Sequence, residues 1–183
     1  MRKFILALIL VTFNQSSALA NKQIVAEQWA LELSETLEKN AFKPIGNTVF
    51  SFLFWDLYKS KLLTTSKQFP LQSEDDKLLY EIEYFKAISG KSLVEKTVEQ
   101  WQHLGYEASR YEPYLNKLQR IWPDINPGDK LTFVMNNSNS AFYHNKRLVG
   151  VMGDIEFGPL FLDIWLSEKT SEPELRKELL GRK

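Results

Sequence analysis

The sequence predicts an α+β fold in which an antiparallel sheet is covered by helices on one face. Three observations lead to this prediction. Several segments of strand length alternate between apolar and polar residues, other segments carry helix start and stop signals, and no repeated strand–helix–strand order indicates a parallel sheet. A chain of 183 residues is also long enough to bury one sizeable core.

The densest apolar run outside the first twenty residues is VFSFLFWDLYKSKLL, residues 49–63. Alternate positions are apolar on both sides, with Phe50, Phe52 and Phe54 on one face and Trp55 on the other. A helix would fit such a short run too, but the aromatic residues and the flanking turn residues favour a strand. A strand that is apolar on both faces is expected at the centre of a sheet, so we predict that Phe52 lies in a central strand.

Periodicity and capping signals predict the remaining elements. The central strand is expected to break within residues 56–59 and to continue as a second strand. Further strands are expected at 78–85, 130–135, 141–143 and 148–152, and helices at 24–39, 92–105, 113–122, 154–165 and 171–181. Two of these helices begin at a capping box, Ser92 with Glu95 and Ser171 with Glu174. Glu81 and Glu83 share one face of their strand, where we expect solvated carboxylates rather than an acid–base pair.

The N-terminus has the pattern of a secretory signal peptide. Basic residues at 2–3 precede an apolar segment at 4–13, and Ala18-Leu19-Ala20 is a small-x-small cleavage site. The apolar segment is too short to span a bilayer, which takes about twenty residues. We therefore expect a signal peptide at 1–20 cleaved after Ala20, a helical lead-in at 21–41 and the main domain at 42–183. The mature protein is expected to be periplasmic, in a Gram-negative bacterium, or secreted, and to have no membrane span.

Composition excludes several classes of function. The chain has no cysteine, which excludes disulfides, thiolate chemistry and zinc sites of the cysteine type. Its two histidines, His103 and His144, are far apart in sequence, and there is no glycine-rich phosphate loop, so no metal or other cofactor is expected. Lys plus Arg and Asp plus Glu both number 23, without a basic cluster, so nucleic acid is not an expected partner.

A set of short stretches in a fixed order carries a family resemblance. These stretches are Phe54–Tyr58, Trp122–Asp124, Pro127–Asp129, Phe142–Tyr143, Leu148–Gly150, Ile164–Leu166, Thr170–Pro173 and Leu179–Gly181. Together they resemble the secreted bacterial branch of the chalcone isomerase-like proteins, over roughly residues 42 to 181. The resemblance implies a chalcone isomerase-like open-faced β-sandwich, with a cleft between a large antiparallel sheet and the helices that cover it.

The resemblance also implies which positions would carry chemistry. The plant enzymes of this family close a chalcone into a flavanone, and other members bind fatty acids in the same cleft. Both groups use an arginine for the anionic group, with a tyrosine and an asparagine as hydrogen-bonding partners, and a threonine or serine lines the enzyme cleft. The matching positions here are Phe50, Leu93, Gln100 and Ile164. Ring closure needs an ionised nucleophile and donors for the enolate, which these side chains do not supply.

We therefore expect a non-catalytic protein that binds a hydrophobic or amphipathic small molecule in the cleft. Asp56, Tyr58 and Gln100 are the candidate residues for orienting this ligand. Because the arginine is missing, the ligand should be more neutral or more apolar than a free fatty acid. Two alternatives stay open: a structural or partner-binding protein that uses its sheet edge or aromatic surface, and an isomerase or lyase whose catalytic residues have not been matched.

Overall fold

The structure is a computed structural model that describes residues 28, 35, 37–38 and 41–182. The chain divides into two units, residues 1–40 and 41–183. The described residues of the first unit are all helical, and the rest of the helix predicted at 24–39 lies outside the described residues, as does the predicted signal peptide. Within the described ranges, no helix is both long and apolar enough to cross a membrane.

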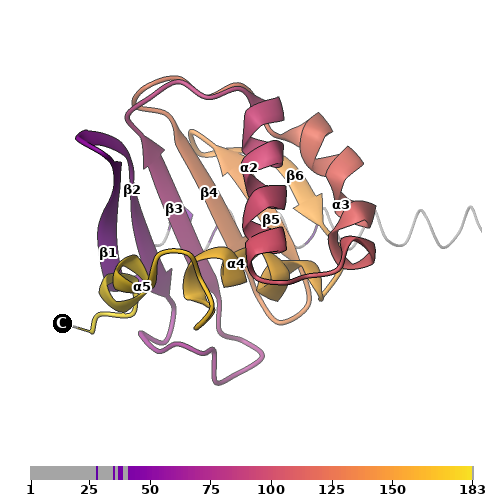
Figure 1. Cartoon of the computed structure of the whole chain (residues 1–183). Helices are drawn as coiled ribbons and strands as arrows, with labels where there is room; N and C mark the ends of the chain where they lie inside the picture. The colour runs from indigo at the N-terminus through magenta and orange to yellow at the C-terminus, as the bar shows by residue number, and fades with distance from the viewer. Residues whose placement is uncertain (1–27, 29–34, 36, 39–40, 183) are drawn as a thin grey trace, which may run out of the picture. The chain divides into compact units, whose positions relative to one another are not determined.

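The second unit is built on a six-stranded antiparallel sheet, shown in Figure 1. Its strands are β1 (Lys43–Phe52), β2 (Trp55–Thr64), β3 (Leu78–Tyr84), β4 (Lys130–Met135), β5 (Ser140–His144) and β6 (Arg147–Met152). They pair in the order in which they occur in the sequence, each antiparallel to the next. The predicted α+β class with an antiparallel sheet is therefore confirmed.

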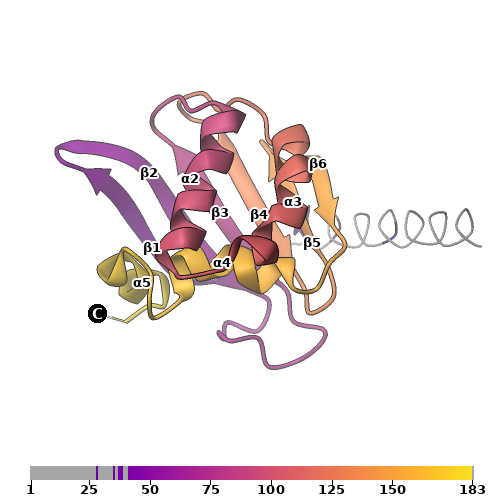
Figure 2. The same ribbon diagram turned by 45° about the vertical axis from the view of Figure 1, so that its right-hand side comes forward.

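Helices cover one face of this sheet, as Figures 1 and 2 show. They are α2 (Gly90–His103), α3 (Ala108–Ile121), α4 (Phe157–Leu166) and α5 (Pro173–Leu179). The core between the layers is aromatic, because Phe161 of α4 lies 4.8 Å from Phe133 and 5.1 Å from Phe142 between ring centroids. Trp101 of α2 donates its indole N–H to the carbonyl oxygen of Leu160 at 2.8 Å, which ties the two helices together. Burial of these large rings supplies much of the hydrophobic stabilisation.

The prediction of a central strand at residues 49–63 is wrong, because these residues belong to a hairpin at the edge of the sheet. The turn falls at Leu53–Phe54, between β1 and β2, rather than at residues 56–59. Phe52 is 62% exposed and Phe54 is 97% exposed, so neither belongs to the core. The run is apolar on both faces because it crosses a turn whose side chains lie in solvent, not because two layers cover it.

The helix starts also differ from the prediction. The N-cap of α2 is Ser89, whose hydroxyl accepts a hydrogen bond from the backbone N–H of Ser92 at 3.1 Å, so Ser92 is not the cap. In α5 the N-cap position is Glu172 and no side chain caps the helix. α3 begins at residue 108 and contains Pro113, and α4 begins at residue 157, after a turn that Asp154 stabilises.

On the opposite face of the sheet, charged residues from three neighbouring strands pair with one another. Lys59 lies 2.9 Å from Glu83 and Lys61 lies 3.8 Å from Glu81, while Lys130 reaches both carboxylates at 3.3 Å. The two glutamates share a face as predicted. The hydrogen bond from Lys59 lowers the pKa of Glu83, because it favours the charged carboxylate.

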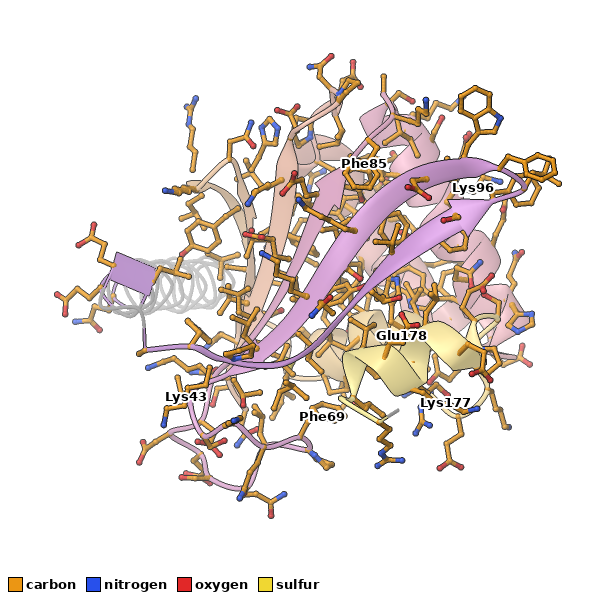
Figure 3. All side chains as sticks on the ribbon, turned by 90° about the vertical axis from the view of Figure 1, so that its left-hand side faces the viewer. Lys43, Phe69, Phe85, Lys96, Lys177 and Glu178 are labelled. Carbon is orange, nitrogen blue, oxygen red and sulfur yellow. The ribbon has the colours of Figure 1, made fainter. Side chains whose placement is uncertain are left out.

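Helix α5 packs directly against the first strand. A Cβ atom at Gly46 would lie 2.1 Å from the carbonyl oxygen of Glu178, so only glycine permits this approach of two backbones. The hydroxyl of Thr48 donates to the carboxylate of Glu178 at 2.5 Å, and Figure 3 shows Glu178 between α5 and the strand. These contacts fix α5 beside β1.

Candidate functional site

Strands β2 and β3 bring three tyrosines together beneath α4. Tyr58 pairs with Tyr84 across the two strands, and their ring centroids are 5.9 Å apart. Tyr80 lies four residues before Tyr84, on the same face, and its ring is 4.7 Å from that of Trp165. Phe50 of β1 packs on Tyr58 at 5.1 Å. We call these five residues the tyrosine cluster.

Two buried hydroxyl groups at this cluster are not fully satisfied. Tyr58 accepts a hydrogen bond from the indole N–H of Trp165 at 3.1 Å. Tyr80 is 0% exposed and Ser60 is 1% exposed, yet neither hydroxyl has a hydrogen-bond partner of good geometry among the described residues. The Ser60 hydroxyl is nevertheless close enough to Tyr80 to offset part of the rise in its pKa. A buried hydroxyl without a partner is costly, so it marks a place where a further polar group can bind.

All three phenols of the cluster are neutral at physiological pH. Burial raises the pKa of Tyr58 to about 12, and the nearby carboxylate of Glu172 adds to the rise. Burial also raises the pKa of Tyr80 and of Tyr84 far above the usual value. The cluster therefore combines an aromatic wall with neutral hydroxyls, and the formal charge that acts on Tyr58 is negative.

The segment between α4 and α5 borders the cluster and connects it to α2. Ser171 donates to the side-chain oxygen of Gln100 at 2.8 Å, and the next residue is Glu172, whose charge acts on Tyr58. Thr170 donates its hydroxyl to the carbonyl oxygen of Ile164 at 2.7 Å, which holds this segment against the end of α4. Helix α4 and the segment that follows it thus lie against the cluster on the side opposite the sheet.

The three candidate residues from the sequence occupy different places. Tyr58 is part of the tyrosine cluster. Gln100 is tied through Ser171 to the segment that borders it. Asp56 is exposed at the start of β2 and accepts a hydrogen bond from Ser51 at 2.6 Å, which closes the base of the hairpin turn. The structure therefore brings Tyr58 and Gln100 towards one site and gives Asp56 a local structural role.

The positions singled out by the family resemblance lie in or near this region. Phe50, at the position of the missing arginine, packs on Tyr58, while Leu93 and Ile164 are buried in the common core. Two cations elsewhere in the chain, Lys61 and Arg110, are engaged by other partners. Lys61 pairs with Glu81 on the opposite face of the sheet, and the guanidinium of Arg110 lies 4.2 Å from the ring centroid of Tyr106.

Sequence reasoning missed Ser60, Tyr80, Tyr84 and Trp165 as site residues. The alternation of residues 78–85 sets Tyr80 and Tyr84 on the strand face opposite to Glu81 and Glu83, which is the face expected to be buried. What the sequence does not contain is the register that sets Tyr58 opposite Tyr84. The sequence did contain one signal for this site. A serine and several tyrosines lie on the apolar faces of neighbouring strands, and buried hydroxyl groups need hydrogen-bond partners.

This arrangement can bind an apolar molecule and orient one polar group. Aromatic side chains supply contact area, and the hydroxyls of Ser60 and Tyr80 can each donate or accept a hydrogen bond. Nothing in the cluster holds a nucleophile in its ionised form, because the phenols have raised pKa values. Among the residues that the structure describes, no cluster of histidine and carboxylate side chains is arranged to hold a metal ion.

Comparison with known proteins places the chain in a family. A solved structure, that of a fatty-acid binding protein from Arabidopsis thaliana, matches 77% of this chain and 87% of its own at 11% identity, with a TM-score of 0.59. An uncharacterized protein from Haemophilus influenzae is 23% identical over 141 residues, which span 77% of this chain and 69% of the relative. The family model described as chalcone isomerase-like matches residues 46–181. The chain therefore belongs to the chalcone isomerase-like family.

Proposed function

We propose that the chain binds a neutral, largely apolar small molecule at the tyrosine cluster, between the sheet and the helices, and that it does not catalyse a reaction on this ligand. The observation that carries the proposal is the pair of buried hydroxyls, Ser60 and Tyr80, which lack good hydrogen-bond partners in the described part of the chain. They lie beside the rings of Tyr58 and Trp165. Small-molecule sites combine such apolar walls with a few convergent polar groups.

Charge supports a neutral ligand over a carboxylate. The position of the family's arginine is held by Phe50, and the formal charge that acts on Tyr58 is the carboxylate of Glu172. An anion placed here would be desolvated without a cationic partner and would be repelled by Glu172, at a cost of several kcal/mol. An alcohol, ester or amide could instead donate to or accept from the hydroxyls of Ser60 and Tyr80.

The structural neighbour supports the general class of ligand. Its name describes a fatty-acid binding protein, and the two chains share their fold. We extend only the apolar part of that description to this chain, because Phe50 stands at the position of the family's arginine and the carboxylate of Glu172 acts on Tyr58.

Location belongs to the proposal as well. The leader at 1–20 supports a periplasmic or secreted protein that begins at Asn21 after cleavage. The mass of the intact protein, purified from the periplasm of a Gram-negative host, should correspond to a chain starting at Asn21. A mass that retains Met1 would contradict this part of the proposal.

Native mass spectrometry of the same periplasmic preparation tests the binding function. We expect a species heavier than the bare chain by the mass of one neutral lipid, which organic extraction should release and identify. Replacing Phe50 with arginine supplies the missing cation, so Phe50→Arg should shift the bound species towards fatty acids. A wild-type protein that carries only fatty-acid carboxylates, or that binds no lipid when neutral lipids are added, would contradict the proposal.

A further inference from the structure

The turn of the β1–β2 hairpin carries a patch of exposed apolar residues, Phe52, Leu53, Phe54 and Trp55, which we call the apolar tip. These four consecutive side chains are 62%, 77%, 97% and 62% exposed. Figure 2 shows the hairpin reaching beyond the neighbouring strands, and Figure 3 shows aromatic rings at its end. Large apolar side chains that lie side by side in solvent mark a contact surface.

The geometry of the turn does not explain these residues. Leu53 has a φ of +56°, a conformation that favours glycine, asparagine or aspartate. The other two-residue hairpin of this chain has positive φ values at Asn145 and Lys146 and uses polar residues there. A leucine thus occupies a position where the backbone conformation favours other residues, which points to a role of Leu53 in contact.

We propose that the apolar tip inserts into the interfacial layer of a phospholipid bilayer, from which the ligand of the tyrosine cluster is taken or to which it is delivered. The part that concerns the ligand rests on the function proposed above. Phe52 and Trp55 form the last pair of the two-stranded ribbon, and Leu53 and Phe54 make its turn. Because this end projects beyond the neighbouring strands, a flat protein surface could bury only some of the four side chains. A bilayer interface can take up all four, and tryptophan and phenylalanine are typical of such interfaces.

Charge and position favour the same partner. The ammonium of Lys86 lies 4.7 Å from the ring centroid of Trp55, where it can reach a lipid phosphate when the ring is inserted. Asp56 is the neighbouring anion, and it is engaged by Ser51 at the base of the turn. Because the charges of Lys86 and Asp56 offset each other beside the tip, binding should depend mainly on apolar contact and only weakly on salt.

The tip is also continuous with the proposed ligand site. Phe52 pairs with Trp55, the next pair along is Ser51 with Asp56, and then comes Phe50 with Tyr58. Rings follow one another from Phe50 to Tyr58 at 5.1 Å and from Tyr58 to Tyr84 at 5.9 Å. A bilayer at the tip would therefore lie about two strand residues, roughly 7 Å, from the edge of the cluster.

Vesicle co-sedimentation tests the insertion, using the processed chain without its leader and vesicles of phosphatidylethanolamine and phosphatidylglycerol. The variant Leu53→Gly/Phe54→Ser suits the turn better, so it should fold at least as well as the wild type. We expect it to lose roughly tenfold or more in vesicle affinity, because two large apolar side chains no longer enter the lipid. The control Ile155→Ser changes another exposed apolar residue, 58% exposed, and should bind like the wild type.

Transfer of a neutral fluorescent lipid from the vesicles to the protein tests the link to the ligand. The Leu53→Gly/Phe54→Ser variant should slow transfer while binding the same lipid normally when it is supplied without vesicles. Equal vesicle binding by this variant and the wild type would overturn the proposal. So would tip-dependent self-association of the wild type without vesicles, which would assign the tip to a second copy of the chain. Failure to bind any lipid in the vesicle-free assay would overturn the proposed function instead.

Discussion

The carboxylate of Asp129 joins two turns at one end of the sheet. It accepts hydrogen bonds from the backbone N–H of Asn126 at 2.8 Å and from the side-chain amide of Asn145 at 2.6 Å, and His144 lies 3.2 Å away. These partners lower the pKa of Asp129 to about 2, and the hydrogen bond from Asn126 has the largest effect. One side chain thus fixes both the turn before β4 and the hairpin turn between β5 and β6.

The substitution Asp129→Asn should therefore destabilise the protein in a way that depends on pH. The folded pKa lies below the unfolded value of about 3.9, so the carboxylate stabilises the fold fully above about pH 4 and loses this effect as the pH falls towards 2. Because the group is partly open to solvent, we expect a loss of about 1 kcal/mol at pH 6. Urea unfolding of both proteins should show the difference shrinking between about pH 4 and 2. A difference that stays constant with pH would contradict this role.

Residue types in the sequence predicted the candidate site only in part. Tyr58 was a candidate and lies in the tyrosine cluster. On an apolar strand, a tyrosine buries its ring and keeps its hydroxyl near a polar partner. Gln100 was singled out from an aligned position and does reach the bordering segment. The sequence could not show that Asp56 has a structural role instead of a role in the site. Its hydrogen bond with Ser51 forms only because the hairpin turns at Leu53 and Phe54.

At the scale of elements, β4 and not β1 holds the central place. The substitution Phe133→Ala should cost about 3–5 kcal/mol, from lost transfer energy and the cavity it leaves among the core rings. Phe52→Ala, at the exposed tip, should change stability by no more than about 0.5 kcal/mol. Urea unfolding of both variants gives the comparison, with circular dichroism to check that each folds. Equal losses for the two would contradict the assignment of residues 49–63 to an edge hairpin.

The β5–β6 and β1–β2 hairpins show why the strands of one were predicted and the turn of the other was not. Residues 144–147 contain Asn145 at a position of positive φ, which is the usual chemical signal of a tight turn. The turn between β1 and β2 uses Leu53 and Phe54, which look like the interior of a strand. Where contact with a partner sets the residues of a turn, local propensity cannot reveal it.

The predictions of where helices begin were wrong for a related reason. Two serines three residues apart, Ser89 and Ser92, both fit the pattern of an N-cap, and spacing alone cannot choose between them. Tertiary contacts decide in favour of Ser89, since the N–H of Gly90 donates to the carboxylate of Asp124 at 2.9 Å and residue Ile88 bridges to Ile125. These partners lie more than thirty residues away in the sequence.

At the scale of the whole molecule, the fold class and the family were predictable and the arrangement of the edge was not. Alternating segments and the lack of a strand–helix–strand repeat suffice for an antiparallel sheet with helices on one face. They do not determine which strand is central. A run of apolar residues has the same sequence pattern whether it is covered by a second layer of the fold or by a partner. The register that assembles Tyr58, Tyr80 and Tyr84 likewise depends on the fold as a whole.

The purified protein should not accelerate chalcone cyclisation. The developing enolate would meet neutral phenols and the carboxylate of Glu172 near Tyr58, without a cation at the position of Phe50. Loss of one transition-state donor typically costs about a hundredfold to a thousandfold in rate. Absorbance-monitored cyclisation near neutral pH should therefore match the buffer rate. A rate well above buffer would mean that unmatched residues act as catalysts.

Competitive displacement of a fluorescent neutral lipid from the mature protein tests most directly whether the tyrosine cluster binds a neutral apolar ligand. Long-chain alcohols or esters should displace the probe better than the carboxylate of the same chain length. Tyr80→Phe removes a hydroxyl inside the cluster and should weaken neutral binding roughly threefold to tenfold, the loss of about one hydrogen bond. Tyr143→Phe is the matched control, since it removes a buried hydroxyl on the opposite face of the sheet that also lacks a hydrogen-bond partner among the described residues, and it should bind like the wild type. Preference for the carboxylate, or equal losses in the two variants, would contradict the proposed site.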